Sequence, residues 1–140
     1  MIKVLLVDDE PDYSATLAKR LAKRDILAEA AGSGPAALAR LEVGDIDVVV
    51  LDVKMPDMDG IETLRRIKES HPLVEVIMLS GHADMETAVR GLETGAFDYL
   101  MKPMRFEDLL YKIEDAHEKK AGHEKKISAR REGSDTGAGR

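Results

Sequence analysis

The chain has 140 residues and a net charge of −6, a size that suits one soluble domain with a real hydrophobic core. It contains no cysteine, which excludes disulfides, thiolate chemistry and cysteine-ligated zinc. No apolar run approaches the roughly 20 residues that span a bilayer, and no signal peptide precedes Met1, so we expect a cytoplasmic protein without a membrane span.

The charge is unevenly distributed along the chain. Residues 1–116 hold 14 Lys and Arg against 23 Asp and Glu, whereas residues 117–131 hold 6 against 2. An acidic body is not expected to bind nucleic acid directly. We therefore predict a folded domain over residues 1–117, followed over 118–140 by a basic helical extension and, from Gly133 onward, a disordered C-terminal tail.

Short apolar runs alternate with helical patterns along the folded part. The predicted strands are 3–7, 26–31, 48–51, 74–79 and 97–101, and the predicted helices begin at Pro11, after Ser33, after Gly60, at Asp84 and at Phe106. Such alternation indicates parallel strands with right-handed crossovers. The most continuous apolar runs, 3–7 and 48–51, belong in the centre. We therefore predict an α/β fold, a flavodoxin-like (βα)5 doubly wound parallel sheet of strand order 2-1-3-4-5.

Two of these strands end in carboxylates. Asp8 and Asp9 follow the first strand, and Asp52 follows the third. Because parallel strands bring their carboxyl ends to one edge of the sheet, we expect these side chains to lie close together. Three neighbouring carboxylates repel one another unless a cation lies among them, and all-oxygen ligation favours Mg²⁺.

A hydroxyl and an ammonium are expected at the same edge, because Ser80 ends the fourth strand and Lys102 follows the fifth. Each residue alone has a plainer explanation as a helix cap, a turn residue or a surface lysine. Together with Asp52 and a metal they form an anion site with a nucleophile inside it, which is what phosphoryl transfer to a carboxylate requires.

Four motifs resemble those of one protein family. They are Val-Asp-Asp-Glu at 7–10, Leu-Asp-Val-Lys-Met-Pro-Asp-Met-Asp-Gly at 51–60, Leu-Ser-Gly at 79–81 and Gly-Ala-Phe-Asp-Tyr-Leu-Met-Lys-Pro at 95–103. In order and spacing they resemble the receiver domains of two-component response regulators. The last motif is most similar to receivers of enhancer-binding, nitrogen-regulation type activators, here without an output domain.

The resemblance implies a phosphoacceptor and a metal site. Asp52 would accept a phosphoryl group from a sensor histidine kinase. Mg²⁺, or Mn²⁺ in its place, would be held by Asp9, Asp52 and the main-chain carbonyl of Lys54, with Asp8 acting through water.

The resemblance also implies how the phosphoryl group is held and sensed. Ser80, Gly81 and Lys102 would contact the phosphoryl oxygens. Tyr99 would move together with Ser80 as the switch, and Pro103 would follow a cis peptide bond.

These observations favour a stand-alone response regulator that is not a metabolic enzyme and that catalyses only its own phosphorylation and dephosphorylation. We expect phosphorylation to change the surface of the fourth helix, fifth strand and fifth helix for an unidentified downstream protein, and we leave a phosphorylation-dependent homodimer open. One alternative is a phosphohydrolase of the haloacid dehalogenase type, whose Asp-x-Asp motif would need an aspartate where Lys54 stands. The other is a phosphorylation-independent interaction domain, against which the complete set of site residues argues.

Overall fold

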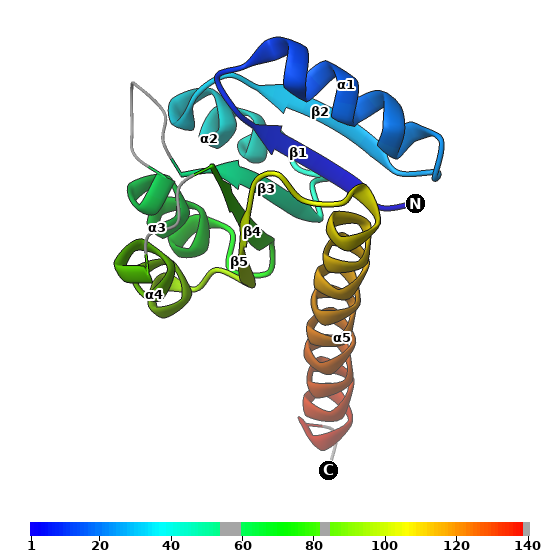
Figure 1. The fold of residues 1–140 in the computed structure, drawn as a ribbon. Coiled ribbons are helices and arrows are strands. Elements are labelled where there is room, and N and C mark those ends of the chain that lie inside the picture. The colour runs from blue at the N-terminus through cyan, green and yellow to red at the C-terminus, as the bar shows by residue number, and fades with distance from the viewer. Residues whose placement is uncertain (54–59, 82–84, 139–140) are drawn as a thin grey trace.

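The structure, a computed structural model, describes residues 1–53, 60–81 and 85–138, with side chains as far as residue 129. Strands and helices alternate along these residues (Figure 1). In chain order they are β1 (Lys3–Val7), α1 (Pro11–Ala22), β2 (Leu27–Ala31), α2 (Gly34–Val43), β3 (Val48–Asp52), α3 (Gly60–Ser70), β4 (Glu75–Ser80), α4 (Met85–Thr94), β5 (Asp98–Met101) and α5 (Phe106–Ala138).

The strands form one parallel sheet of order β2-β1-β3-β4-β5, which confirms the predicted fold class and strand order. The two central strands are apolar because they are covered on both faces. Val4 to Val7 on β1 and Val48 to Leu51 on β3 are each at most 4% exposed. Edge strand β2 is largely exposed, in keeping with the polar Glu29 in its sequence.

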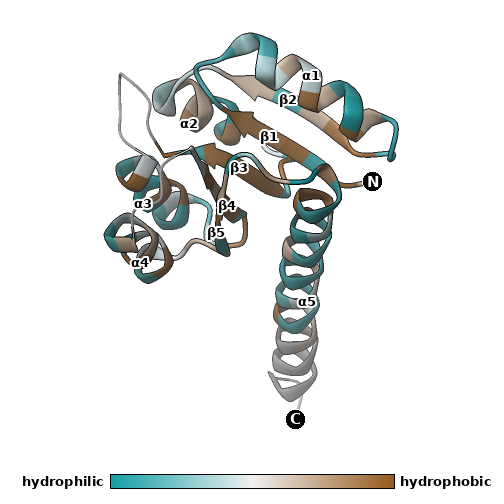
Figure 2. Ribbon diagram, in the orientation of Figure 1, coloured by the Kyte–Doolittle hydropathy of each residue, from teal (hydrophilic) through white to brown (hydrophobic). Residues whose placement is uncertain are grey.

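Two helical layers enclose the sheet and divide the core in two. On one face, α2 and α3 pack on one set of alternate strand residues, among them Leu5, Val49 and Met78. On the other face, α1 and α5 pack on the remaining set, through side chains such as Leu21 and Ile113. Figure 2 shows the result, apolar strands in the middle and polar residues along the outer sides of the helices.

Helix α4 buries fewer residues than the other helices. Within Met85–Thr94 the buried residue is Gly91, whose small size lets the helix approach Met78 on β4. Met85, Val89 and Leu92 are exposed, although in the sequence they have the spacing of an apolar helical face. The start predicted at Asp84 lies outside the described residues.

Helix α5 extends well beyond the sheet. Its 33 residues correspond to a length of about 50 Å. Where it passes the amino-terminal edge of the sheet, Lys119 Nζ lies 3.1 Å from Glu75 Oε2 and Lys120 Nζ lies 3.2 Å from Asp47 Oδ1. Beyond these two ion pairs the helix projects away from the sheet (Figure 1).

Helix α5 continues without a break past residue 118, where the predicted extension begins. The helix also includes residues 133–138, where the sequence predicts a disordered tail, and 139–140 lie outside the described residues. An established helix propagates at low cost through the Lys, Glu, Ala and Arg residues of 118–132, whereas residues 133–138, Gly-Ser-Asp-Thr-Gly-Ala, are weaker helix formers that only continue it. The division at residue 117 stays a prediction. Within the described ranges no helix is both long enough and apolar enough to cross a membrane.

Gly60, the first residue of α3, fits only because it has no side chain. Its N–H donates to the carbonyl oxygen of Val53 at 2.9 Å, and an added Cβ would lie 2.6 Å from Val53 Cα and 2.8 Å from that oxygen. We expect Gly60→Ala to destabilise the fold by about 1–3 kcal/mol, because the clash is with backbone, and to lower the Tm by roughly 4–12 °C. Gly122→Ala is the matched control.

Gly122 lies inside α5 with no atom within 4 Å of an added Cβ. Alanine is the better helix former there, so Gly122→Ala should leave the Tm unchanged or raise it slightly. Thermal unfolding of the two variants followed by circular dichroism is the measurement. Equal Tm values for both would contradict the close approach of Gly60 to Val53.

Candidate functional site

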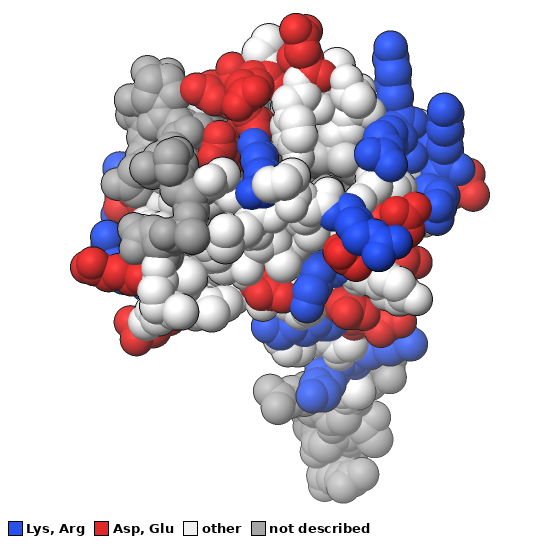
Figure 3. Space-filling model, in the orientation of Figure 1, with Lys and Arg blue, Asp and Glu red and all other residues white. Residues whose placement is uncertain are grey.

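The carboxyl ends of the central strands bring the predicted site residues to one edge of the sheet. Val7 pairs with Leu51, which places Asp8 beside Asp52. Asp52 in turn pairs with Leu79, next to Ser80. Figure 3 shows acidic side chains gathered over this part of the molecule, whereas Lys and Arg gather at the far end of α1 and along α5.

Asp8 is the buried carboxylate of the site, at 7% exposure. Its Oδ1 accepts a hydrogen bond from the N–H of Glu10 at 2.9 Å. Its Oδ2 accepts one from Lys102 Nζ at 3.0 Å. Because both oxygens have partners, the orientation of Asp8 is fixed. Its predicted action on a metal through water stays a prediction.

Lys102 is positioned by three contacts. Its main-chain N–H donates to the carbonyl oxygen of Ser80 at 2.7 Å, and its peptide bond to Pro103 is cis, as predicted. Its Nζ forms the ion pair with Asp8 and also lies 4.3 Å from the centre of the Tyr13 ring. These contacts direct the ammonium toward the carboxylates.

The charges around Lys102 and Tyr13 shift their pKa values. Burial alone would lower the pKa of Lys102, but the hydrogen bond and charge of Asp8, together with Asp52 and Tyr13, raise it above the usual value. Burial raises the pKa of Tyr13, an effect that the charge of Lys102 opposes and the nearby carboxylates, Asp8 first among them, reinforce. Lys102 is therefore a permanent cation at physiological pH.

Three consecutive acidic residues form a tight group of oxygens. Carboxylate oxygens of Asp8, Asp9 and Glu10 lie within 4.8 Å of one another, with Asp9 and Glu10 exposed. Half-buried Asp52 is on the neighbouring strand and is not a member of this group. An all-carboxylate donor set open to solvent fits a hard cation such as Mg²⁺. The carbonyl of Lys54, also predicted as a ligand, lies outside the described residues.

The remaining predicted residues lie at the ends of β4 and β5. Ser80 is buried at 2% exposure, and Gly81 after it is exposed. Tyr99 is half-buried and packs against the core between the sheet and the α2–α3 layer. The proximity of Ser80 to Asp52 is as expected, whereas the roles predicted for Ser80, Gly81 and Tyr99 toward a phosphoryl group stay predictions.

Sequence reasoning missed two members of the site. Tyr13 shares with Leu17 and Leu21 the i, i+4 spacing of an apolar helical face, and that spacing gives no sign of a contact with Lys102. Glu10 was noted after the aspartate pair but not as a candidate ligand. For Glu10 the signal was present, since consecutive acidic residues in a loop can gather around one cation.

Comparison with known proteins agrees with the family resemblance of the sequence motifs. A family model described as the response regulator receiver domain matches residues 4–114. The transcriptional regulatory protein ZraR of Escherichia coli K12 is 38% identical over 115 residues, which are 82% of this chain and 26% of that protein. The DNA-binding transcriptional regulator NtrC of Salmonella typhimurium is 35% identical over 113 residues, covering 81% of this chain and 24% of that protein. This chain thus spans about a quarter of each relative.

Solved structures of similar size agree over nearly their full length. A CheY-like receiver domain protein from Methanospirillum hungatei has a TM-score of 0.84 at 30% identity, covering 88% of this chain and 98% of that one. The beryllofluoride-activated NtrC4 receiver domain dimer has a TM-score of 0.81 at 35% identity, covering 86% and 99%. The resemblance to receivers of nitrogen-regulation type activators is therefore confirmed.

The acidic group predicts a cation site that can be measured in the isolated protein. We expect Mg²⁺ titration, followed by NMR, to perturb the amides around residues 8–10 and 52. Asp9→Asn should weaken the binding at least about tenfold, because a neutral amide replaces an anionic ligand.

Asp12→Asn is the matched control, since Asp12 lies in the first turn of α1 outside the acidic group. It removes the same charge and should bind Mg²⁺ nearly as well as wild type. Equal losses in the two variants would mean that general charge, and not a ligand site, attracts the ion.

Proposed function

Since the chain belongs to the response regulator receiver domain family, we propose that it is a signalling switch whose Asp52 accepts a phosphoryl group from a sensor histidine kinase. The supporting observation is the Asp8–Lys102 ion pair beside Asp52, at the carboxyl edge of the sheet. This pair supplies a cation next to a half-buried carboxylate, which is what an incoming phosphoryl group needs.

The proposed reaction uses the carboxylate of Asp52 as nucleophile. A carboxylate oxygen forms the new bond to phosphorus while the bond from phosphorus to the donor breaks, and the donor leaves with its electron pair. A Mg²⁺ ion held by Asp9 and Asp52 would supply positive charge that offsets the repulsion between carboxylates and phosphoryl oxygens. Lys102, already directed toward this edge, would bind a phosphoryl oxygen, and buried Ser80 would donate to another.

This chemistry acts on the protein itself, so we propose a switch and not a metabolic enzyme. The phosphoryl group would be lost again by hydrolysis at Asp52. A phosphohydrolase of the haloacid dehalogenase type would instead turn over small phosphate esters, and we expect no such turnover.

The proposed phosphorylation is tested with acetyl phosphate as donor. We expect Asp52 to take up one phosphoryl group in the presence of Mg²⁺ and none after chelation with EDTA, because charge neutralisation is required for attack. Asp52→Asn should take up none, whereas Asp45→Asn, altered at the opposite edge of the sheet, should behave like wild type. Intact-protein mass spectrometry gives the result. Equal uptake by wild type and Asp52→Asn would refute the assignment.

The output of the switch is proposed to be a changed surface over α4, β5 and α5. Helix α4 buries Gly91 but exposes Met85, Val89 and Leu92, and the strand β5 that contacts it exposes Met101. Asp98 of β5 forms an ion pair with Lys112 of α5, with 2.7 Å between Oδ2 and Nζ. Such a surface suits an unidentified downstream protein or a second copy of the chain, the NtrC4 structure being that of a dimer.

Ser80 is proposed to start this change. When it moves toward a phosphoryl oxygen it leaves space below the end of β4, and Tyr99 on the neighbouring strand would turn to fill it. The expected coupling is about 1–3 kcal/mol, a shift of roughly 5- to 150-fold in partner affinity.

This switch predicts where fluoroberyllate, a phosphoryl mimic, will perturb the protein. With Mg²⁺ present, residues 81–105 should show larger chemical-shift or hydrogen-exchange changes than the remote helix α1. Ser80→Ala should bind the mimic but lose most of the response in α4 and β5, because the hydroxyl that follows the phosphoryl group is missing. A response spread evenly over the chain, or a full response in Ser80→Ala, would show that the coupling runs elsewhere.

A further inference from the structure

The ring of Tyr13 covers the ammonium of Lys102. Nζ lies 4.3 Å from the ring centre, within the range of a cation–π interaction. The two residues come from α1 and from the end of β5, so the contact joins segments that are far apart in the sequence. The same ammonium forms an ion pair with the Asp8 carboxylate, at 3.0 Å.

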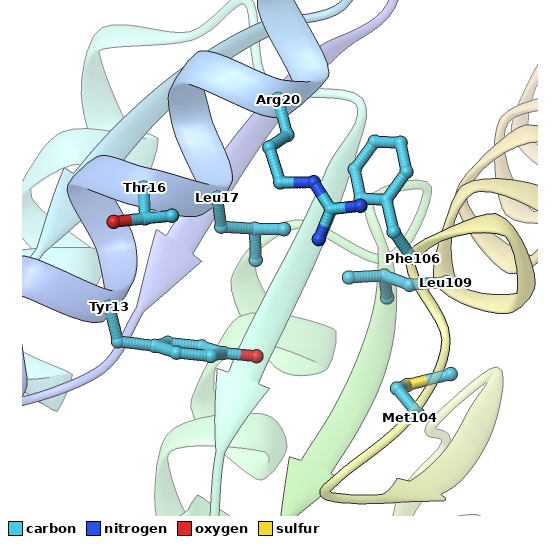
Figure 4. A pocket seen from close by; sticks show the side chains of 7 residues that line it. All are labelled: Tyr13, Thr16, Leu17, Arg20, Met104, Phe106 and Leu109. Carbon is cyan, nitrogen blue, oxygen red and sulfur yellow. The ribbon is translucent and has the colours of Figure 1, made fainter.

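Tyr13 lies between two hollows of the surface. It lines a small pocket beside Asp8 and Asp52 at the carboxyl edge. It also lines a larger cavity of about 120 Å³ between α1 and α5. Figure 4 shows this cavity, with Tyr13 extending from α1 toward the connection that bears Met104. The ring is half-buried and belongs to a helix anchored in the core by Leu17 and Leu21, so its position is well defined.

Asp8 and the ring of Tyr13 differ in how their attraction for Lys102 changes when a cation or a phosphoryl group binds at the site. A cation bound among the carboxylates partly neutralises the negative charge of Asp8, which weakens the attraction between Asp8 and Lys102. A phosphoryl group on Asp52 attracts the ammonium away from Asp8 as well. The ring face carries no net charge, so neither event neutralises it, and its attraction for the ammonium persists.

We propose that Tyr13 is a positioning residue of the phosphoryl-transfer site, whose ring holds the flexible Lys102 side chain at the carboxyl edge while its charged partner changes from Asp8 to the phosphoryl group. This inference rests on the proposed phosphorylation of Asp52. The ring acts through its face, so phenylalanine can replace it and an aliphatic side chain cannot.

The test compares Tyr13→Phe, Tyr13→Leu and Tyr13→Met in the full chain. We expect Tyr13→Phe to stay within about twofold of wild type in fluoroberyllate affinity and in the maximal rate of phosphorylation by acetyl phosphate. Tyr13→Leu and Tyr13→Met should each lose about two- to tenfold in both, the range of one cation–π contact. The Mg²⁺ affinity of these Tyr13 variants should be unchanged, because the ring is not a proposed metal ligand. A variant that disturbed the site in general would change the Mg²⁺ affinity as well.

Two controls separate positioning from structure. Tyr111→Leu alters an exposed tyrosine on α5 and should match wild type. In a Lys102→Met background, Tyr13→Leu should cause no further loss, since the partner of the ring is gone.

Each outcome has a defined meaning. Wild-type behaviour of Tyr13→Leu and Tyr13→Met, or an undiminished loss in the Lys102→Met background, overturns the inference while the proposed function stands. Failure of wild type itself to take up phosphate overturns the proposed function, and this inference with it.

Discussion

The ion pair between Asp8 and Lys102 is the interaction on which the site depends. It joins the loop after β1 to the end of β5 across the carboxyl edge of the sheet, with Nζ and Oδ2 3.0 Å apart. Without Lys102, buried Asp8 would lie among acidic neighbours and, within the described residues, would have no ion-pair partner, an arrangement that is strongly unfavourable. The pair therefore serves both to hold the edge together and to keep a cation beside Asp52.

The two edges of the sheet treat their acidic residues differently. At the amino edge, buried Glu75 is paired with Lys68 and Lys119, each at 3.1 Å, and Asp47 is paired with Lys120 at 3.2 Å. At the carboxyl edge, Lys102 faces Asp8 while Asp9 and Glu10 are exposed beside it. The excess of negative charge is thus concentrated where a metal cation and a phosphoryl group would meet. The long helix α5 contributes to this contrast, because both Lys119 and Lys120 come from it.

The sequence was sufficient to predict the sheet, because strand order depends on apolar runs and short connections. The residues that begin and end helices could also be predicted from the sequence. Ser33 caps α2 by accepting a hydrogen bond from the N–H of Ala36 at 3.2 Å, and Gly44 ends that helix with a φ of 94°. The expectation that Asp8, Asp52 and Lys102 would meet followed from parallel topology alone.

Other features depend on three-dimensional packing and could not be read from periodicity. The contact of Tyr13 with Lys102 requires the fold to bring the first turn of α1 close to the end of β5, and no local sequence pattern indicates that. Periodicity also gave α4 an apolar side but could not show that the body of the domain leaves Val89 and Leu92 uncovered. A hydrophobic pattern indicates which side of a helix can be buried, whereas the neighbouring elements decide whether it is.

The most direct test of this account is a crystal structure with Mg²⁺ and fluoroberyllate bound, in which the position of Lys102 Nζ is measured. The account predicts that Nζ leaves Asp8 Oδ2, now 3.0 Å away, and bonds to a fluorine of the adduct on Asp52. An adduct on Asp52 with Lys102 still bonded to Asp8 would contradict it, because the cation held at this edge would then have no part in binding the phosphoryl group.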